Sequence, residues 1–270
     1  MSDWVWYLLL IPAGFLAGVV NTIAGGGSFL TLPALMFVCG LDPKIANGTN
    51  RVAILLSSGS ASTTFYRNGS IDLKLVMRLC VPLLLGAPVG VLSAIYLPVE
   101  AFKPVFGALF LAMAGLLAFK PKLLTGAERE PISSPIAEFI LFLGIGIYIG
   151  FIQAGMGILL LLAMGIFHAR DLVNANAAKN VIGFIVTIFA LSVFVLFGQV
   201  DWIPGLILAV GNLMGGYVGA RIAISKGQKL VFTFLMVVMV ATGLKLLWPT
   251  SQSDSQEVER HSTQVTELLR

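Results

Sequence analysis

Charged residues are what this 270-residue sequence has least of. They make up 11% of the chain, against roughly 25% in soluble proteins, while hydrophobic residues make up 57%. The charges are also clustered, which leaves long uncharged stretches at 4–41, 79–99 and 139–167. A helix needs about 20 apolar residues to cross the hydrocarbon core of a bilayer. This composition excludes an ordinary soluble fold and predicts a multi-pass membrane protein.

The sequence also lacks the patterns of several enzyme and pump classes. It holds two cysteines and two histidines, none with metal-ligand spacing, so Cys39 and Cys80 are interpreted as packing residues. No phosphate-binding loop of the type G-x-x-x-x-G-K-[ST] occurs, which argues against ATP-driven transport by this chain. A His-Glu-x-x-His motif is missing too, and no carboxylate lies in the middle of a span. We therefore expect no metal, no cofactor, no catalytic residue and no enzyme activity.

An internal duplication divides the chain into two halves. A shift of 130 positions superposes Gly14, Ala24, Gly25, Gly27, Leu30, Leu32, Phe37 and Asn50 on Gly144, Ala154, Gly155, Gly157, Leu160, Leu162, Phe167 and Asn180. Only helices or closed barrels satisfy every backbone group in lipid, and the ten-residue alternation of a barrel is missing. The expected fold class is therefore an all-α polytopic membrane protein with about ten segments in two five-segment repeats.

Apolar runs and polar breaks place these segments along the chain. We expect a first transmembrane repeat at 1–119, a basic linker at 120–134, a second repeat at 135–248 and a polar tail at 249–270. The ten segments are expected near 4–23, 28–40, 43–66, 73–97, 99–119, 135–154, 157–168, 172–198, 202–224 and 228–248. The short pieces at 28–40 and 157–168 follow glycine-rich motifs, which indicates broken helices.

Loop charges predict that the two repeats are inverted. The basic loops carry Arg67, Lys74 and Arg78 in the first repeat and Arg221, Lys226 and Lys229 in the second. These loops occupy different positions in the two repeats, and their partner loops carry only Glu100 and Lys103 or Asp201. Because loops rich in Lys and Arg stay cytoplasmic, the halves should insert upside down relative to each other, with the linker in the cytoplasm.

A run of three glycines lies inside the first apolar stretch. Residues 21–28 read NTIAGGGS, and residues 153–157 of the second half read QAGMG. Each motif should break its helix and begin a short new one, whose N-terminal amides and dipole favour an anion. The alternative is close helix packing through small residues, which we expect for spaced glycines such as Gly14 and Gly18. The candidate substrate-binding residues are Asn21, Gly25, Gly26, Gly27, Ser28, Gln153, Gly155 and Gly157.

An asparagine beside a cation follows each glycine motif. Asn50 and Asn180 lie 23 residues beyond the last glycine of the motif in their half, with Arg51 after the first and Lys179 before the second. A guanidinium and an ammonium suit an oxyanion, and ionisable groups at membrane depth are costly enough to suggest function. The alternative is that both cations snorkel to the interface at helix ends. The candidates from these two clusters are Asn47, Thr49, Asn50, Arg51, Asn176, Lys179 and Asn180.

The residues of the repeat also carry a family resemblance. The pattern G-x-x-x-G-x-x-N-T-I-A-G-G-G-S-x-L-x-x-P-A-L begins at Gly14, and G-L-x-P-x-x-A-N-G-T-N-R ends at Arg51. Together they resemble the first half of the TauE/SafE family of sulfite and organosulfonate exporters, and residues 150–180 resemble its second repeat. The resemblance covers residues 8–248, and one departure is Met156, which interrupts the second glycine run. It implies a multi-pass inner-membrane carrier of small sulfur-containing anions such as sulfite, sulfoacetate or other organosulfonates.

Three functions follow from this reading of the sequence. The first is a secondary transporter, an exporter by the resemblance, with a central anion site and alternating access. The second is a passive anion channel, because inverted repeats permit both. The third is an intramembrane enzyme or sulfur-relay component, for which only Cys39, Cys80 and His168 could supply a reactive centre. We expect a small anionic substrate and the lipid bilayer as partners, no nucleic acid, and leave open whether the chain forms a homo-oligomer.

Overall fold

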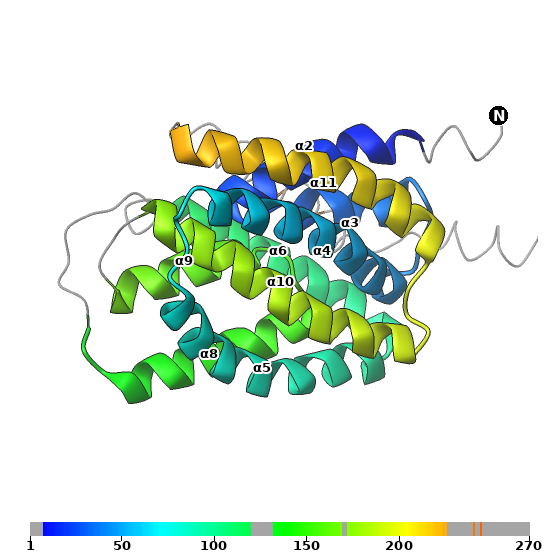
Figure 1. Cartoon of the computed structure of the whole chain (residues 1–270). Helices are drawn as coiled ribbons and strands as arrows, with labels where there is room; N and C mark the ends of the chain where they lie inside the picture. The colour runs from blue at the N-terminus through cyan, green and yellow to red at the C-terminus, as the bar shows by residue number, and fades with distance from the viewer. Residues whose placement is uncertain (1–7, 120–131, 169–171, 226–239, 241–243, 245–270) are drawn as a thin grey trace, which may run out of the picture.

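A computed structural model of the protein describes residues 8–119, 132–168, 172–225, 240 and 244. Within this part of the chain every regular element is a helix, and the helices pack side by side into one bundle (Figure 1). The expected tenth segment at 228–248 lies outside the described residues apart from Val240 and Leu244. The expected tail at 249–270 and most of the linker lie outside them as well.

The helices follow the expected segments closely. The first half contains α2 (Leu10–Ala24), α3 (Ser28–Phe37), α4 (Pro43–Arg67), α5 (Leu73–Tyr96) and α6 (Val99–Phe119), and the second half contains α8 (Pro135–Phe151), α9 (Met156–Phe167), α10 (Leu172–Leu196) and α11 (Trp202–Ser225). Side chains cap several of them: Asp42 accepts the N–H of Lys44 at the start of α4, and Asp72 accepts the N–H groups of Lys74 and Leu75 at the start of α5.

Length and composition support several membrane crossings. Among the described residues, four helices are long and apolar enough to span a bilayer, at Leu73–Tyr96, Val99–Leu116, Val173–Leu196 and Trp202–Ile224. The protein is thus an all-α, multi-pass membrane protein.

The first helix of the second half is shorter than the expected 135–154, because α8 ends at Phe151. The next residue, Ile152, has extended backbone with φ −141° and ψ 129°, so the chain leaves the helix before the glycines.

Two central helices lie antiparallel between two outer helix pairs. The backbone of Gly48, near the start of α4, faces Gln199 just beyond the end of α10, whereas Gly59 further along α4 faces Phe184 nearer the start of α10. On one side of this pair α2 packs along α11, and on the other α5 packs along α8 (Figure 1). The arrangement is the one expected of an inverted repeat. The complete inverted architecture, which includes 228–248, stays a prediction.

Spaced glycines bring the outer helices into backbone contact, as predicted. A Cβ atom on Gly14 or Gly18 of α2 would overlap the backbone of α11 at Leu208 or Asn212. Glycines at 86 and 90 of α5 approach α8 in the same way, through the carbonyl groups of residues 143 and 147. Small residues allow such close packing where lipid offers no hydrophobic drive for helix association. These glycines therefore serve packing.

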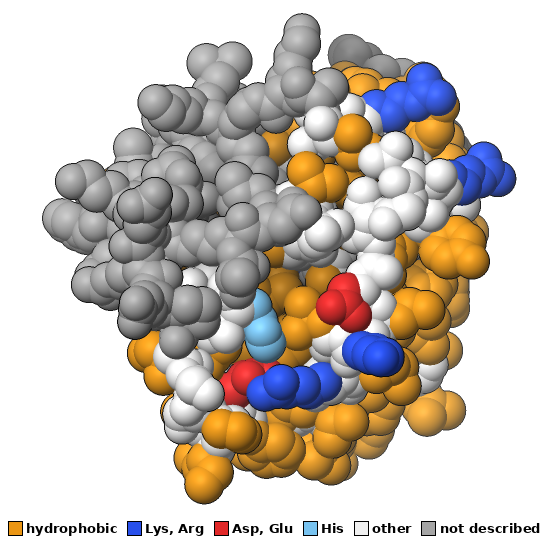
Figure 2. Space-filling view, turned by 60° about the vertical axis from the view of Figure 1, so that its left-hand side comes forward, with side chains coloured by type: hydrophobic (Ala, Val, Ile, Leu, Met, Phe, Trp, Pro, Cys, Tyr) orange, Lys and Arg blue, Asp and Glu red, His pale blue; other side chains and the backbone are white. Residues whose placement is uncertain are grey.

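The basic side chains of the loops gather at one end of the bundle. An ion pair joins Arg78 of α5 to Glu138 of α8, and Arg67 and Arg221 line one cavity between the ends of α4 and α11. Figure 2 views this end, where charged side chains interrupt an otherwise hydrophobic surface. At the opposite end, the N–H of Asp201 donates to the hydroxyl of Thr49. Arg67, Arg78 and Arg221 thus lie at the same end of the bundle, which is called the arginine-bearing end below.

Candidate functional site

Both glycine motifs break their helices. In the first half α2 ends at Ala24, because Gly25 adopts a left-handed conformation with φ 82° and ψ 16°. In the second half Gly155 has φ 75° and immediately precedes α9. Positive φ is strongly disfavoured for residues with a Cβ, so glycine fits both positions. The two predicted breaks are therefore confirmed, including the second, where Met156 interrupts the glycine run.

The two breaks touch each other at the centre of the bundle. The N–H of Gly157 donates to the carbonyl of Gly25 at 3.2 Å. A Cβ atom on either glycine would overlap the backbone of the other. Gly27 is equally confined, against the carbonyl of Ala17. The glycine motifs therefore do two things at once: they end helices, and they permit close packing of the two halves.

The start of α3 presents a polar group of side chains beside unused backbone amides. The N–H groups of Gly26 and Gly27 are buried and make no hydrogen bond within the described part of the chain. The neighbouring Ser28 hydroxyl accepts a hydrogen bond from the Asn50 side-chain amide at 3.1 Å. The carbonyl oxygen of that amide accepts from the hydroxyl of Thr31. Asn50 thus ties α4 to the first turn of α3, whose dipole favours negative charge.

Arg51 is completely buried and binds the end of α8 in the other half. Its Nη2 donates to the carbonyl oxygens of Gly150 at 2.7 Å and Ile149 at 3.1 Å. Its Nη1 donates to the side-chain oxygen of Gln153 at 3.5 Å, and its guanidinium lies 4.6 Å from the ring centroid of Phe194. The last carbonyl groups of a helix attract cations. Arg51 therefore reaches across the bundle from α4 to stabilise a helix end.

Lys179 makes the reciprocal contact from the second half. Its Nζ donates to the carbonyl oxygens of Thr22 at 2.7 Å and Asn21 at 3.2 Å, in the last turn of α2. Its side chain is 1% exposed, and that of Arg51 is 0% exposed. Both cations thus meet helix ends, as the alternative expected, but they do not snorkel to the interface, because neither head group reaches the surface. Among the described residues, neither forms an ion pair with a carboxylate.

The remaining candidates divide between this centre and other places. The side-chain amide of Asn47 donates to the Phe151 carbonyl at 2.8 Å, next to the contacts of Arg51. Asn180 bonds within its own helix, to the carbonyl of Asn176 at 2.8 Å. Thr49 faces the other way, toward the start of α11. The structure brings together Asn21, Gly25, Gly26, Gly27, Ser28, Asn47, Asn50, Arg51, Gln153, Gly155, Gly157 and Lys179 around the touching breaks.

Several polar neighbours of the centre were missed from the sequence. Gln153 donates to the hydroxyl of Thr187, which itself donates to its own helix. The hydroxyl of Tyr148 donates to the Ala154 carbonyl at 2.6 Å and so shapes the second break. Thr31 supports Asn50 in the first half. These residues could have been predicted as isolated hydroxyls in otherwise apolar helices, because a buried hydroxyl needs a hydrogen-bond partner.

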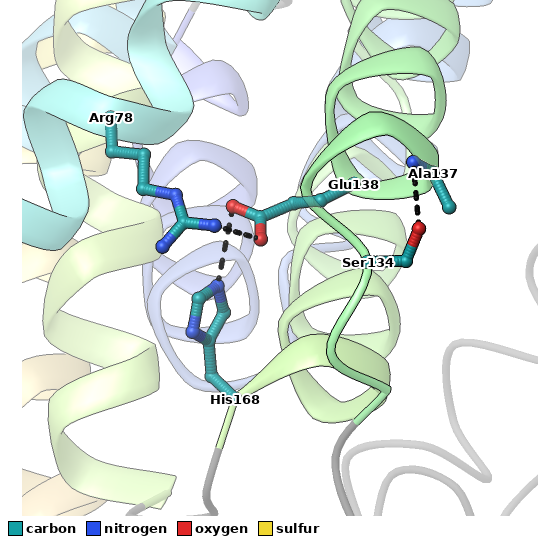
Figure 3. Close-up of polar contacts among 5 residues, drawn as sticks. All are labelled: Arg78, Ser134, Ala137, Glu138 and His168. Atoms are coloured by element: carbon teal, nitrogen blue, oxygen red, sulfur yellow. Dashed lines mark hydrogen bonds and ion pairs between the residues drawn. The ribbon is translucent and has the colours of Figure 1, made fainter.

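A separate ionic cluster joins three helices at the arginine-bearing end. Figure 3 shows Arg78 and His168 both pointing toward the carboxylate of Glu138, at 2.6 Å and 3.6 Å. Glu138 is 5% exposed and lies in the first turn of α8, where the helix dipole favours a negative charge. Glu138 was not predicted from the sequence, because it lies at the start of a span and not in its middle. His168, which seemed isolated in the sequence, therefore has a charged neighbour.

The two cysteines lie apart from this centre. Cys80 is buried in a cluster of core residues that includes Leu79 and Leu83, as expected for a packing residue. Cys39 is half-buried and follows the end of α3. The described residues contain no group of three or more Cys, His, Asp and Glu side chains suited to a metal ion.

Comparisons with known proteins identify the family of the chain. Residues 10–246 match the family described as "Sulfite exporter TauE/SafE". The chain is 31% identical over 249 residues to a "Probable membrane transporter protein ORF9" from Sinorhizobium sp, covering 92% of this chain and 95% of that protein. It is 30% identical over 252 residues to the "Probable membrane transporter protein YfcA" of Escherichia coli strain K12, covering 93% and 91%.

A third relative is a "Probable membrane transporter protein" from Haemophilus influenzae, 28% identical over 240 residues, with 89% of this chain and 94% of that protein covered. No solved structure matches the chain. The family match spans both halves, with their glycine breaks and their buried cations. The chain is a multi-pass membrane transporter that belongs to the sulfite exporter TauE/SafE family.

Proposed function

We propose that this protein is a secondary transporter that exports small sulfur-containing anions, such as sulfite, sulfoacetate or other organosulfonates, across the inner membrane. The proposed substrate site lies at the touching breaks, between the start of α3 and the two buried cations. The family description supports the class of anion. The chemistry of the site supports the charge sign independently.

The observation that carries the proposal is an excess of buried positive charge. Arg51 and Lys179 are buried, and among the described residues only neutral groups contact their charged ends. Removing a charge from water costs several kcal/mol per ion, by order of magnitude, and a paired carboxylate would offset that cost. The carbonyl oxygens that contact Arg51 and Lys179 offset only part of this desolvation cost. The remaining positive potential would stabilise an anion at the same place.

The unpaired amides just before α3 supply matching hydrogen-bond donors. Gly26 and Gly27 offer two buried N–H groups that have no acceptor among the described residues. Sulfite and sulfonates carry several acceptor oxygens and no strong donor, so they complement such a set. Ser28 and Asn50 add polar groups from two different helices. We assign the substrate oxygens to this end of the site.

The contacts that hold the halves together support a mechanism of alternating access. Arg51 of the first half binds the end of α8, and Lys179 of the second half binds the end of α2. The hydrogen bond from Gly157 to Gly25 adds a third link between the halves. Each link can be exchanged for a contact with substrate oxygen. Substrate entry would therefore loosen one half from the other and permit the change of access.

The first experiment removes each buried charge separately. Lys179→Gln and Arg51→Gln should lower uptake of radiolabelled sulfite or sulfoacetate into proteoliposomes by about 100-fold, the size expected for losing buried charge contacts of roughly 3 kcal/mol. Lys179→Arg and Arg51→Lys keep the charge and should retain part of the flux. Lys103→Gln serves as the control, because Lys103 is exposed. Unchanged flux in both neutral variants, with normal folding, would remove the site assignment.

The kind of transport is tested with the same vesicles. A carrier should show saturable flux and counterflow, in which unlabelled anion inside accelerates entry of labelled anion. Large unitary currents without counterflow would indicate the passive channel instead. Full transport by a variant without Cys39 and Cys80 would argue against a sulfur-relay role.

The inverted orientation of the repeats has its own test. Single cysteines at positions 74 and 100, in a background without the native cysteines, should differ in reactivity toward a membrane-impermeant reagent added outside. Position 100 should react and position 74 should not, because the basic loop is expected in the cytoplasm. Labelling at both positions would refute the inversion.

A further inference from the structure

The cavity lined by Arg67 and Arg221 extends along α4 from Leu55 to Arg67. It has a volume of about 780 Å³ and lies between α4, α10 and α11, near the arginine-bearing end of the bundle. Arg67 at its mouth is 16 residues from Arg51 along α4, which corresponds to about 24 Å of helix. The charged end of the cavity is therefore well separated from the proposed substrate site, while its apolar end reaches Leu55, four residues from Arg51.

The walls of this cavity are mainly apolar and face outward. Leu56 is 37% exposed, Leu213 is 44% exposed and Tyr217 is 41% exposed, and the ring of Phe184 forms part of the wall. On a membrane-spanning helix, exposed side chains of this kind meet lipid rather than water. Leu213 and Tyr217 lie on α11, which is long and apolar enough to span a bilayer, so they turn this wall of the groove toward acyl chains. A small hydrated anion would find few partners along it.

One end of the groove is positively charged. Arg67 is exposed at the last residue of α4, and Arg221 lies near the end of α11, with its guanidinium 4.5 Å from the ring centroid of Tyr217. Thr63 and Thr64 also line this end, and their hydroxyls donate to carbonyl groups of their own helix. Those hydroxyl oxygens can still accept hydrogen bonds. Two guanidiniums above an apolar groove complement a phosphate that carries a hydrocarbon tail.

We propose that this groove binds one anionic phospholipid. The phosphate contacts Arg67 and Arg221, a glycerol headgroup lies beside the hydroxyls of Thr63 and Thr64, and an acyl chain lies along Leu56 and Leu213. The occupant is a lipid rather than a soluble anion, because most of the lining is apolar and open to the bilayer. The lipid would bridge α4 and α11, and so hold one central helix to one outer helix.

Native mass spectrometry of the full chain in detergent, with phosphatidylglycerol or phosphatidylcholine added, tests this site. The unmodified protein should retain one phosphatidylglycerol with a preference of about tenfold over phosphatidylcholine, as expected for two arginines near a lipid phosphate. The double variant Arg67→Gln/Arg221→Gln should lose that preference. Lys74→Gln is the matched control, because Lys74 is exposed near the same end and does not line the groove. It should keep the preference.

A second variant blocks the groove without changing charge. Ser60→Trp places a large ring among the lining residues and should abolish retention of the bound lipid, while size-exclusion behaviour shows that the protein is folded. An unchanged preference in the double arginine variant would overturn the proposal. Equal loss in Lys74→Gln would also overturn it, since general surface charge would then explain binding. Displacement of the lipid by millimolar sulfite would overturn it as well and would indicate a route for substrate.

Discussion

The two glycine breaks occupy matching positions in the duplicated sequence, yet different groups complete them. At the first break, the N–H groups of Gly26 and Gly27 make no hydrogen bond within the described residues. At the second, the N–H of Met156 donates to Gln153 and that of Gly157 donates to Gly25. The protein itself thus pairs the amides at the start of the second short helix, while the two at the first have no acceptor among the described residues. A duplicated motif therefore need not supply two equal binding sites.

The buried cations show the same combination of symmetry and difference. Both cross to the last turn of a helix in the opposite half, so their roles as partners of helix ends are equivalent. Arg51 also contacts Gln153 and the ring of Phe194, whereas the Lys179 ammonium donates only to two carbonyl groups among the described residues. A planar guanidinium can hold several partners at once, and an ammonium on a flexible stem exchanges them more freely. We expect Lys179 to be the more readily recruited by substrate.

The largest expected effect comes from placing a methyl group at the first break. Gly25→Ala should destabilise the protein by about 3 kcal/mol or more, because left-handed backbone costs roughly 1–2 kcal/mol and the Cβ would overlap the backbone of Gly157. Gly155→Ala meets the flexible end of Met113 and should cost less. Folded yield and thermal unfolding in detergent measure both. Equal losses would refute the view that backbone contact distinguishes the two breaks.

A change at Gln153 tests whether the second break depends on the polar side chain of this residue. Its counterpart in the first half is Ile23, so Gln153→Leu makes the two breaks more alike. The variant removes a partner of both Arg51 and Thr187 and should cost about 1–3 kcal/mol. Gln153→Glu instead offers Arg51 a carboxylate and should lower anion flux.

Uptake by proteoliposomes and thermal unfolding separate the two Gln153 variants. Ile23→Val is the control, because it changes the matching position without altering a polar group. A Gln153→Glu protein with normal anion flux would contradict the idea that net positive charge at the centre drives binding.

The paired asparagines provide a smaller, matched comparison. Asn50→Ala removes the link between α4 and the side chains of Ser28 and Thr31, and should cost roughly 1–2 kcal/mol and reduce transport. Asn180→Ala removes a bond within one helix and should cost about 1 kcal/mol or less. Unfolding midpoints and initial rates of uptake give both quantities. A greater transport defect in Asn180→Ala than in Asn50→Ala would contradict the proposal that substrate binds at the first break.

The smallest effect is expected at the ionic cluster, which the first half lacks because Leu8 occupies the position matching Glu138. Glu138→Gln should lower stability by about 1 kcal/mol, since the side chain of its partner Arg78 is 55% exposed and solvent weakens the pair. A double-mutant cycle with Arg78→Gln isolates the interaction. Coupling of several kcal/mol would show that the cluster behaves as a buried pair.

Much of the backbone could be predicted because its signals are local. Uncharged apolar runs predicted the helices from α3 to α11 within a few residues, and the glycines predicted where α2 ends and α9 begins. The end of α8 was predicted three residues too late, since Ile152 leaves the helix without any glycine or proline at that residue. The hydroxyl of Tyr148 and the side chain of Gln153 shape this segment, and both find their partners only after folding.

The sequence by itself determined that this chain lies in a membrane, is duplicated, breaks its helices at two glycine motifs and carries an unlike cation after each motif. Only the tertiary structure decided that Arg51 and Lys179 bind helix ends of the opposite halves, that Gly25 touches Gly157, and that Thr49 faces away. Composition and backbone preference act over neighbouring residues. The partners of Arg51 and Lys179 lie about 100 and 160 residues away along the chain, and side-chain direction and helix crossing alone bring them together.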